Sequence, residues 1–235
     1  FLYTAAARPQ RLATSTITSY YHNVLRLARL MLTEPDAATM RLLSGLATKR
    51  IQRWGRPTVD QRGVFSRDDV LRAVQNRTAD PAVAAAMAAC WDTVSRAGSL
   101  LTRQSPGSRT IPTPRSQAAV SRVGTHLHVT LHVFEKMSKA WEHLHLTTDS
   151  ASPRFNPANV GGAVALARLI ASRRDATESL WRKRDGKHVV SSDLVAALVA
   201  VNPHLRGCRI APHGFRISSA SWLINHARIS RERVQ

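Results

Sequence analysis

Hydrophobic residues recur along this chain with two different periods, and these periods predict most of its elements. Strict alternation of hydrophobic and polar residues over 125–133 and 141–147 predicts two half-buried strands, which the intervening turn should pair as an antiparallel hairpin. The fold class predicted is therefore mixed α+β, mainly α-helical, with a small antiparallel β-sheet. Spacing of three to four residues predicts helices over 17–32, 37–53, 66–75, 81–101, 160–171 and 191–201, and a last helix that His213 opens and that continues to 224.

Turn-forming residues mark where the predicted elements begin and end. Ser66, followed three residues later by Asp69, forms a capping box with Asp in place of Glu, and Asp80 precedes a first-turn proline. A segment rich in Pro, Ser and Arg, 105–116, predicts an exposed loop. The segment 54–63, rich in Gly, Pro and charge, is the best linker candidate. It divides the chain into two predicted domains, 1–60 and 61–235.

The charge of the chain indicates a polyanionic partner. Its 235 residues carry 34 Lys+Arg against 15 Asp+Glu, a formal net charge of +19, and arginine supplies most of the excess. No tail holds this excess, so the folded body should present a positive surface, which suits nucleic acid. The hydrophobic content of 43% allows a packed core, and no hydrophobic run is long enough to span a membrane. The two cysteines, far apart in the sequence, predict neither a disulfide framework nor a structural zinc site.

A histidine and an arginine three residues apart open the last predicted helix. On a helix, His213 and Arg216 project from one face. The imidazole can move a proton near neutral pH, and the guanidinium offers a fork of donors suited to a phosphate. In a chain with ten histidines and 34 Lys+Arg, a surface arginine beside a turn histidine is the simpler alternative.

Two further basic side chains are candidates for binding an anion. Arg96 lies late in the hydrophobic helix predicted over 81–101, where an unpaired charge is costly to bury, so it is either at the surface or faces an anion. Lys139, with Lys136 as its rival, lies in the turn of the predicted hairpin. A lysine in such a turn is ordinarily just solvated.

Histidines make up much of the polar face of this hairpin. Alternate residues of a strand share a face, so a His-x-His pair can chelate a metal. No carboxylate or cysteine joins these histidines at ligand spacing, so the polar face of a sheet is the favoured interpretation, and neither metal nor cofactor is predicted. The five residues are His126, His128, His132, His143 and His145.

Arg96, the turn lysine and the His213–Arg216 pair occur in an order typical of one protein family. The chain resembles the catalytic domain of the tyrosine recombinase (phage integrase) family. Residues 91–101 resemble the first of the family's two sequence motifs (boxes), with Arg96 as the motif's arginine. Residues 211–223 resemble the second box, with His213 and Arg216. The helices over 15–53 resemble the last two of the family's helical core-binding (SAM-like) domain. The resemblance thus implies a partial core-binding domain over 1–60 and a catalytic domain over 61–235.

This resemblance implies DNA strand cleavage and rejoining in site-specific recombination or integration, as in phages and mobile elements, with no metal or cofactor. A tyrosine hydroxyl attacks a DNA phosphodiester, which gives a 3′-phosphotyrosyl bond and a free 5′-hydroxyl. Arg96 and Arg216 would bind the phosphate oxygens, Lys139 would protonate the leaving 5′-oxygen, and His213 would assist proton transfer at the nucleophile. The family's tyrosine follows the second box at a greater distance than 216–235 allows, so we expect it beyond Gln235 and expect the chain as given to be inactive.

Double-stranded DNA is the expected partner, and the resemblance adds a homo-oligomer assembled on that DNA. Localisation would be nuclear for a eukaryotic mobile element and cytoplasmic or nucleoid for a bacterial or phage protein. The alternatives are a type IB topoisomerase-like enzyme, which shares the chemistry, and a non-catalytic basic protein, either a degenerate recombinase or an RNA- or ribosome-associated scaffold. Basic residues that we expect to contact DNA, or else to form solvated faces, are Arg41, Lys49, Arg50, Arg53, Arg182, Lys183, Arg184 and Lys187.

Overall fold

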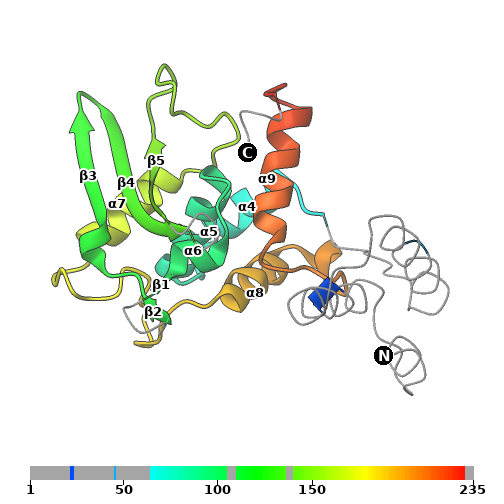
Figure 1. The fold of residues 1–235 in the computed structure, drawn as a ribbon, viewed down its shortest axis with the longest axis horizontal. Helices are drawn as coiled ribbons and strands as arrows, with labels where there is room; N and C mark the ends of the chain where they lie inside the picture. Colours follow the sequence, from blue (N-terminus) through cyan, green and yellow to red (C-terminus); the bar gives the residue numbers. More distant parts are fainter. Residues whose placement is uncertain (1–21, 24–44, 46–63, 105–109, 136–139, 231–235) are drawn as a thin grey trace, which may run out of the picture. The chain divides into compact units, whose positions relative to one another are not determined.

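The chain divides into two compact units, Phe1–Gln61 and Arg62–Gln235. The computed structural model describes residues 22–23, 45, 64–104, 110–135 and 140–230. All the named elements therefore belong to the second unit (Figure 1). The predicted helices over 17–32 and 37–53 fall almost entirely outside the described residues, and the predicted linker over 54–63 falls wholly outside them.

Six α-helices are described in the second unit, and most begin where the sequence predicts. Ser66 caps the first through a capping box with Asp69, and Asp80 caps the second, whose first residue is Pro81. Both capping predictions are confirmed. In chain order the helices are α4 (Arg67–Gln75), α5 (Pro81–Asp92), α6 (Ala97–Leu101), α7 (Gly162–Ala171), α8 (Ser191–Val201) and α9 (Gly214–Asn225).

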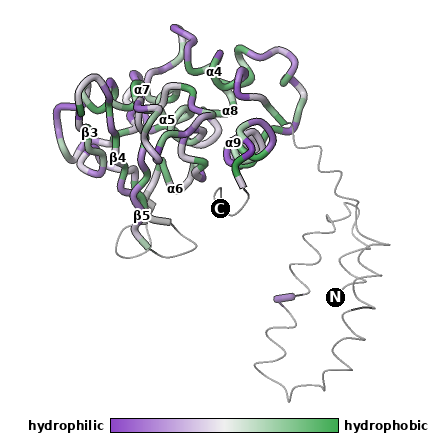
Figure 2. The backbone as a smooth tube through the Cα atoms, turned by 90° about the horizontal axis from the view of Figure 1, so that it is seen from above, coloured by the Kyte–Doolittle hydropathy of each residue, from purple (hydrophilic) through white to green (hydrophobic). Residues whose placement is uncertain are grey.

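The predicted hairpin is confirmed as part of a three-stranded antiparallel sheet in the order β3-β4-β5. The hairpin strands are β4 (His126–Glu135) and β5 (Ala140–Thr147), and β3 (Ala118–Val123) pairs with the other edge of β4. Hydrophobic and hydrophilic residues alternate along β4 (Figure 2). A separate two-stranded sheet joins β1 (Thr102–Gln104) to β2 (Thr110–Pro112). The prediction of a loop throughout 105–116 is therefore wrong at β2, whose backbone pairs with β1.

The core forms where α5 passes between the sheet side and the remaining helices (Figure 1). The middle of α5 is buried on all sides, which its small alanines allow because they let neighbouring helices approach closely. On the sheet, α7 packs against the hydrophobic face, where Val129, Leu131 and Val133 are buried. No helix among the described residues is long and hydrophobic enough to cross a membrane.

Candidate functional site

A helix break positions Arg96. The sequence predicts one helix over 81–101, but α5 ends at Asp92 and α6 begins at Ala97, so this prediction is wrong. The backbone N–H of Ser95 donates to the Cys90 carbonyl at 3.1 Å, and that of Val94 donates to the Trp91 carbonyl at 3.3 Å, the pattern of a Schellman motif.

This motif requires a left-handed residue, and Val94 supplies it with φ of 54°. The conformation costs a β-branched residue about 1–2 kcal/mol, so the surrounding contacts must enforce it. As a result Arg96 does not lie late in a helix but immediately before α6, where its side chain is half-buried.

A buried aromatic residue fixes the orientation of the first turn of α9. Phe215 is fully buried and packs edge-on against Phe65, with ring centroids 4.9 Å apart. A Cβ added at Gly214 would lie 3.1 Å from the Phe65 ring, so the approach is close. His213, at the helix entry, is exposed, and Arg216 is half-buried. Among the described residues no carboxylate forms an ion pair with Arg216.

The segments that carry Arg96 and Arg216 are in direct contact. The Ser219 hydroxyl, on a fully buried side chain one turn after Arg216, donates to the Trp91 carbonyl at 2.7 Å. Trp91 lies in the last turn of α5, five residues before Arg96. Phe65 also contacts Trp91, with ring centroids 6.1 Å apart, and thus lies against both segments.

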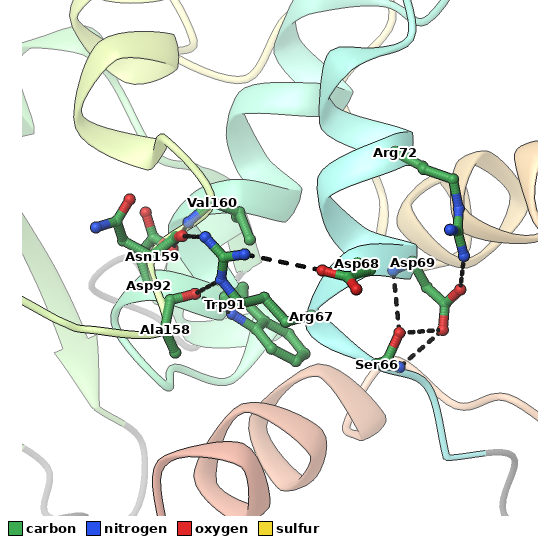
Figure 3. Close-up of polar contacts among 10 residues, drawn as sticks. All are labelled: Ser66, Arg67, Asp68, Asp69, Arg72, Trp91, Asp92, Ala158, Asn159 and Val160. Atoms are coloured by element: carbon green, nitrogen blue, oxygen red, sulfur yellow. Dashed lines mark hydrogen bonds and ion pairs between the residues drawn. The ribbon is translucent and has the colours of Figure 1, made fainter. Parts of the chain in front are cut away.

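The end of α5 is tied to the loop that leads into α7 (Figure 3). The Trp91 indole N–H donates to the Ala158 carbonyl at 2.9 Å, and Arg67 donates to the same carbonyl at 3.1 Å. The guanidinium of Arg67 also donates to the Asn159 carbonyl at 2.7 Å. These contacts hold the helix end from which the Arg96 turn departs.

Asp92 completes this attachment from inside the protein. Its carboxylate accepts the backbone N–H groups of Val160 at 2.8 Å and Gly162 at 2.7 Å, and the side chain is buried. Burial raises the pKa of Asp92 to about 6, against the opposing effects of the two N–H donors and of Arg67. Asp92 is thus a residue that positions the helix break.

The hairpin is the third element of the predicted site. Its strand β4 packs against α6, the short helix that Arg96 precedes. Lys139 and its rival Lys136 lie outside the described residues, as do Arg41, Lys49, Arg50 and Arg53. The convergence of Arg96, Lys139, His213 and Arg216 on one phosphate therefore stays a prediction.

The basic turn, Arg182–His188, is anchored next to the same short helix. The buried Trp181 donates its indole N–H to the Leu100 carbonyl of α6 at 2.9 Å. Arg182 and His188 form an isolated β-bridge, and Gly186 adopts a φ of 82° that closes the turn.

The four basic residues predicted in this turn do not have equivalent surroundings. Lys183 forms an ion pair with Asp193 at 3.3 Å, and Arg182 lies 3.6 Å from Glu178. Arg184 and Lys187 are exposed. The turn therefore presents two exposed basic side chains, Arg184 and Lys187. The charges of the other two, Arg182 and Lys183, are partly balanced by carboxylates.

Asp92 and Ser219 position the site, although neither was predicted to do so from the sequence. A carboxylate at the C-terminal end of a helix opposes the helix dipole, so the position of Asp92 was itself a signal of a tertiary partner. Nothing in the serine-rich start of α9 distinguishes Ser219 from Ser218 or Ser221. Within the described ranges, no three His, Cys, Asp or Glu side chains are placed to share a metal ion.

Comparison with known proteins identifies no relative: no family model matches the chain, and neither a curated protein nor a solved structure matches it.

Proposed function

We propose that this chain carries the phosphate-binding part of a tyrosine recombinase, which cleaves and rejoins DNA strands in site-specific recombination or integration. The observation that carries the proposal is the contact between Ser219 and Trp91. It joins the two segments, far apart in sequence, that hold the arginines expected at a scissile phosphate. The packing of β4 on α6 supports the same arrangement, because it sets the hairpin beside the first arginine.

Each residue has a defined role in the proposed reaction. A tyrosine hydroxyl attacks the phosphorus of a duplex DNA phosphodiester, the P–O bond to the 5′-oxygen breaks, and a 3′-phosphotyrosyl bond forms. Arg96 and Arg216 stabilise the charge on the non-bridging oxygens, each by about 2–4 kcal/mol. Lys139 gives a proton to the leaving 5′-oxygen, and His213 takes part in proton transfer from the tyrosine. A segment after Gln235 supplies the tyrosine, and the protein assembles as a homo-oligomer on DNA.

Covalent trapping tests this proposal. The chain, continued along its reading frame past Gln235, is incubated with a pool of end-labelled duplexes of random sequence, each with a nick. A nick just 3′ of the scissile phosphate releases a short 5′-hydroxyl fragment that diffuses away, so the protein stays attached to the 3′ end. The expected result is a labelled complex that survives denaturation and whose formation Arg96→Ala or Arg216→Ala slows by about 30-fold or more. Arg184→Ala is the matched control, because it removes one exposed arginine of the basic turn and should leave trapping within a few-fold.

A non-catalytic basic DNA-binding protein is the second candidate, and the net charge of +19 favours it. This protein would bind the nicked duplexes without trapping any of them. The same experiment therefore decides between the two functions, provided that binding is measured alongside.

A further inference from the structure

One face of the β3-β4-β5 sheet carries a cluster of histidines that takes no part in the proposed reaction. The register pairs His132 with His143 and Thr130 with His145, so all four side chains point to the same face. The rings of His132 and His143 meet edge to face with centroids 3.7 Å apart, and those of His143 and His145 lie nearly parallel at 6.2 Å. We call His132, His143 and His145 the histidine cluster; His126 and His128 extend the same face along β4.

An arginine holds one ring of the cluster in its neutral form. Arg154 Nη1 lies 3.3 Å from His145 Nδ1, and Thr130 Oγ1 lies 3.3 Å from the same nitrogen. Because a guanidinium only donates, His145 Nδ1 must accept and therefore carries no proton in this contact. Burial, Arg154 and His143 together lower the pKa of His145.

At the described positions of β3, β4 and β5, the face of the cluster carries no carboxylate. On β3 the residues paired with this face are Ala119, Ser121 and Val123, none of them charged. Glu142 of β5 occupies a register position of the opposite face, since it pairs with Val133, which is buried on the hydrophobic side. In the loop after β5, the Asp149 carboxylate already accepts the Ala151 N–H at 3.0 Å.

The face thus gathers imidazoles beside a permanent cation, while the strand positions of this face carry no carboxylate. A metal ion is not the favoured occupant, because no three ligands of the described residues are arranged around one point. An anion is favoured because it relieves the repulsion among protonated rings and Arg154.

We propose that the histidine cluster, with Arg154, is a second binding surface for the phosphates of duplex DNA, filled only when its imidazoles are protonated. On protonation His145 loses its acceptor nitrogen, so Arg154 and His145 both become donors that a phosphate oxygen accepts. The inference goes beyond the proposed reaction and requires only that the protein bind duplex DNA.

Salt-dependent DNA binding at two pH values tests this surface. A fluorescent duplex of random sequence, about 20 base pairs long, is titrated with the 235-residue chain at about pH 5.5 and about pH 7.5. Each additional phosphate neutralised steepens the dependence of log affinity on log salt by about 0.9. We expect the slope to steepen by about 2 at the lower pH, and the affinity to rise at least tenfold.

Three variants make the result specific to the cluster. His143→Gln/His145→Gln should remove most of the pH-dependent increment and leave binding at about pH 7.5 within twofold. His204→Gln/His226→Gln, which removes two histidines from other elements, should keep the increment. His143→Lys/His145→Lys fixes the charge and should give tight binding at both pH values.

The proposal is contradicted if the cluster and control variants lose the pH-dependent increase in binding equally, or if the wild type shows no such increase. Binding that depends on pH through the cluster but leaves the salt slope unchanged also overturns it, because no added phosphate is then neutralised. These outcomes are separate from the proposed function, whose failure appears as an absence of covalent trapping at any pH.

Discussion

Ser219 donates a hydrogen bond to the carbonyl oxygen of Trp91 at 2.7 Å, although 128 residues of chain separate the two. Both groups are buried, and the bond joins the first half of α9 to the last turn of α5. The carbonyl also accepts the N–H of Val94, so the same oxygen belongs to the helix break that positions Arg96.

The first prediction concerns this bond. Ser219→Ala leaves a buried carbonyl with one partner fewer, so the free energy of unfolding should fall by about 1–2 kcal/mol. Ser221→Ala, two residues further along the same helix and only half-buried, should change it by less than about 0.5 kcal/mol. Urea unfolding at constant m-value measures both, and equal effects of the two variants would contradict the role given to Ser219.

The second prediction concerns the pH dependence of stability. Folding raises the pKa of Asp92 from the ordinary value of about 3.9 to about 6, so the folded state binds this proton more tightly. The carboxyl therefore stabilises the protein most below about pH 4, and that contribution is lost as the pH rises through about 6.

In urea titrations, the stability of the wild type relative to Asp92→Asn should fall by about 2 kcal/mol between pH 4 and pH 7. The exposed Asp68→Asn variant, compared in the same way, is the control. A difference between wild type and Asp92→Asn that rises with pH would show that the two N–H donors outweigh burial, and that the pKa is lowered.

The third prediction concerns the close packing of α7 on α5. A Cβ on Gly162 would lie 2.6 Å from an oxygen of Asp92 and 3.2 Å from the Ala88 backbone carbon, so Gly162→Ala should destabilise the protein by about 1–3 kcal/mol. Gly98→Ala is the matched control, since no atom lies within 4 Å of its Cβ and the position is helical. It should be neutral or raise stability by up to about 1 kcal/mol. Thermal unfolding measures both effects. If Gly162→Ala and Gly98→Ala lowered the unfolding temperature equally, the close packing at Gly162 would not be the cause.

The fourth prediction compares the exposed basic residues of the basic turn with its ion-paired lysine in DNA binding. Arg184→Gln/Lys187→Gln should reduce the salt slope of duplex binding by about 0.9 for each phosphate that the variant no longer neutralises. Lys183→Gln should leave the slope nearly unchanged, because Lys183 already pairs with Asp193. Binding isotherms over a range of salt give both slopes, and a larger reduction from Lys183→Gln would reverse the assignment.

Local patterns predicted the elements whose formation depends on neighbouring residues. The alternation of β4 and β5 and the caps at Ser66 and Asp80 were all readable, because each is set within a few positions of the chain. The strand β3 was not predicted. Its exposed, alanine-containing sequence has little strand preference of its own, and pairing with β4 organises it.

The helix break after Asp92 was missed for the same physical reason. A run rich in alanine favours continuing the helix to 101, whereas the break is held by Asp92 contacts to Val160 and Gly162. Those partners lie about seventy residues away in the sequence, beyond the reach of any local pattern. For the candidate site, sequence order named Arg96, His213 and Arg216, but the bond that joins their segments appears only in the folded chain.

The central claim is that Arg96 and Arg216 act on one phosphate, and a double-mutant cycle on the trapping rate tests it most directly. Single-turnover rates are measured on one trapped duplex for the extended chain, for Arg96→Ala, for Arg216→Ala and for the double variant. We predict that each single variant slows trapping by about 30-fold or more. The double variant should be far less impaired than the product of the two losses, because the arginines act as a unit. Losses that multiply in full, or single variants as fast as Arg184→Ala, would contradict the claim.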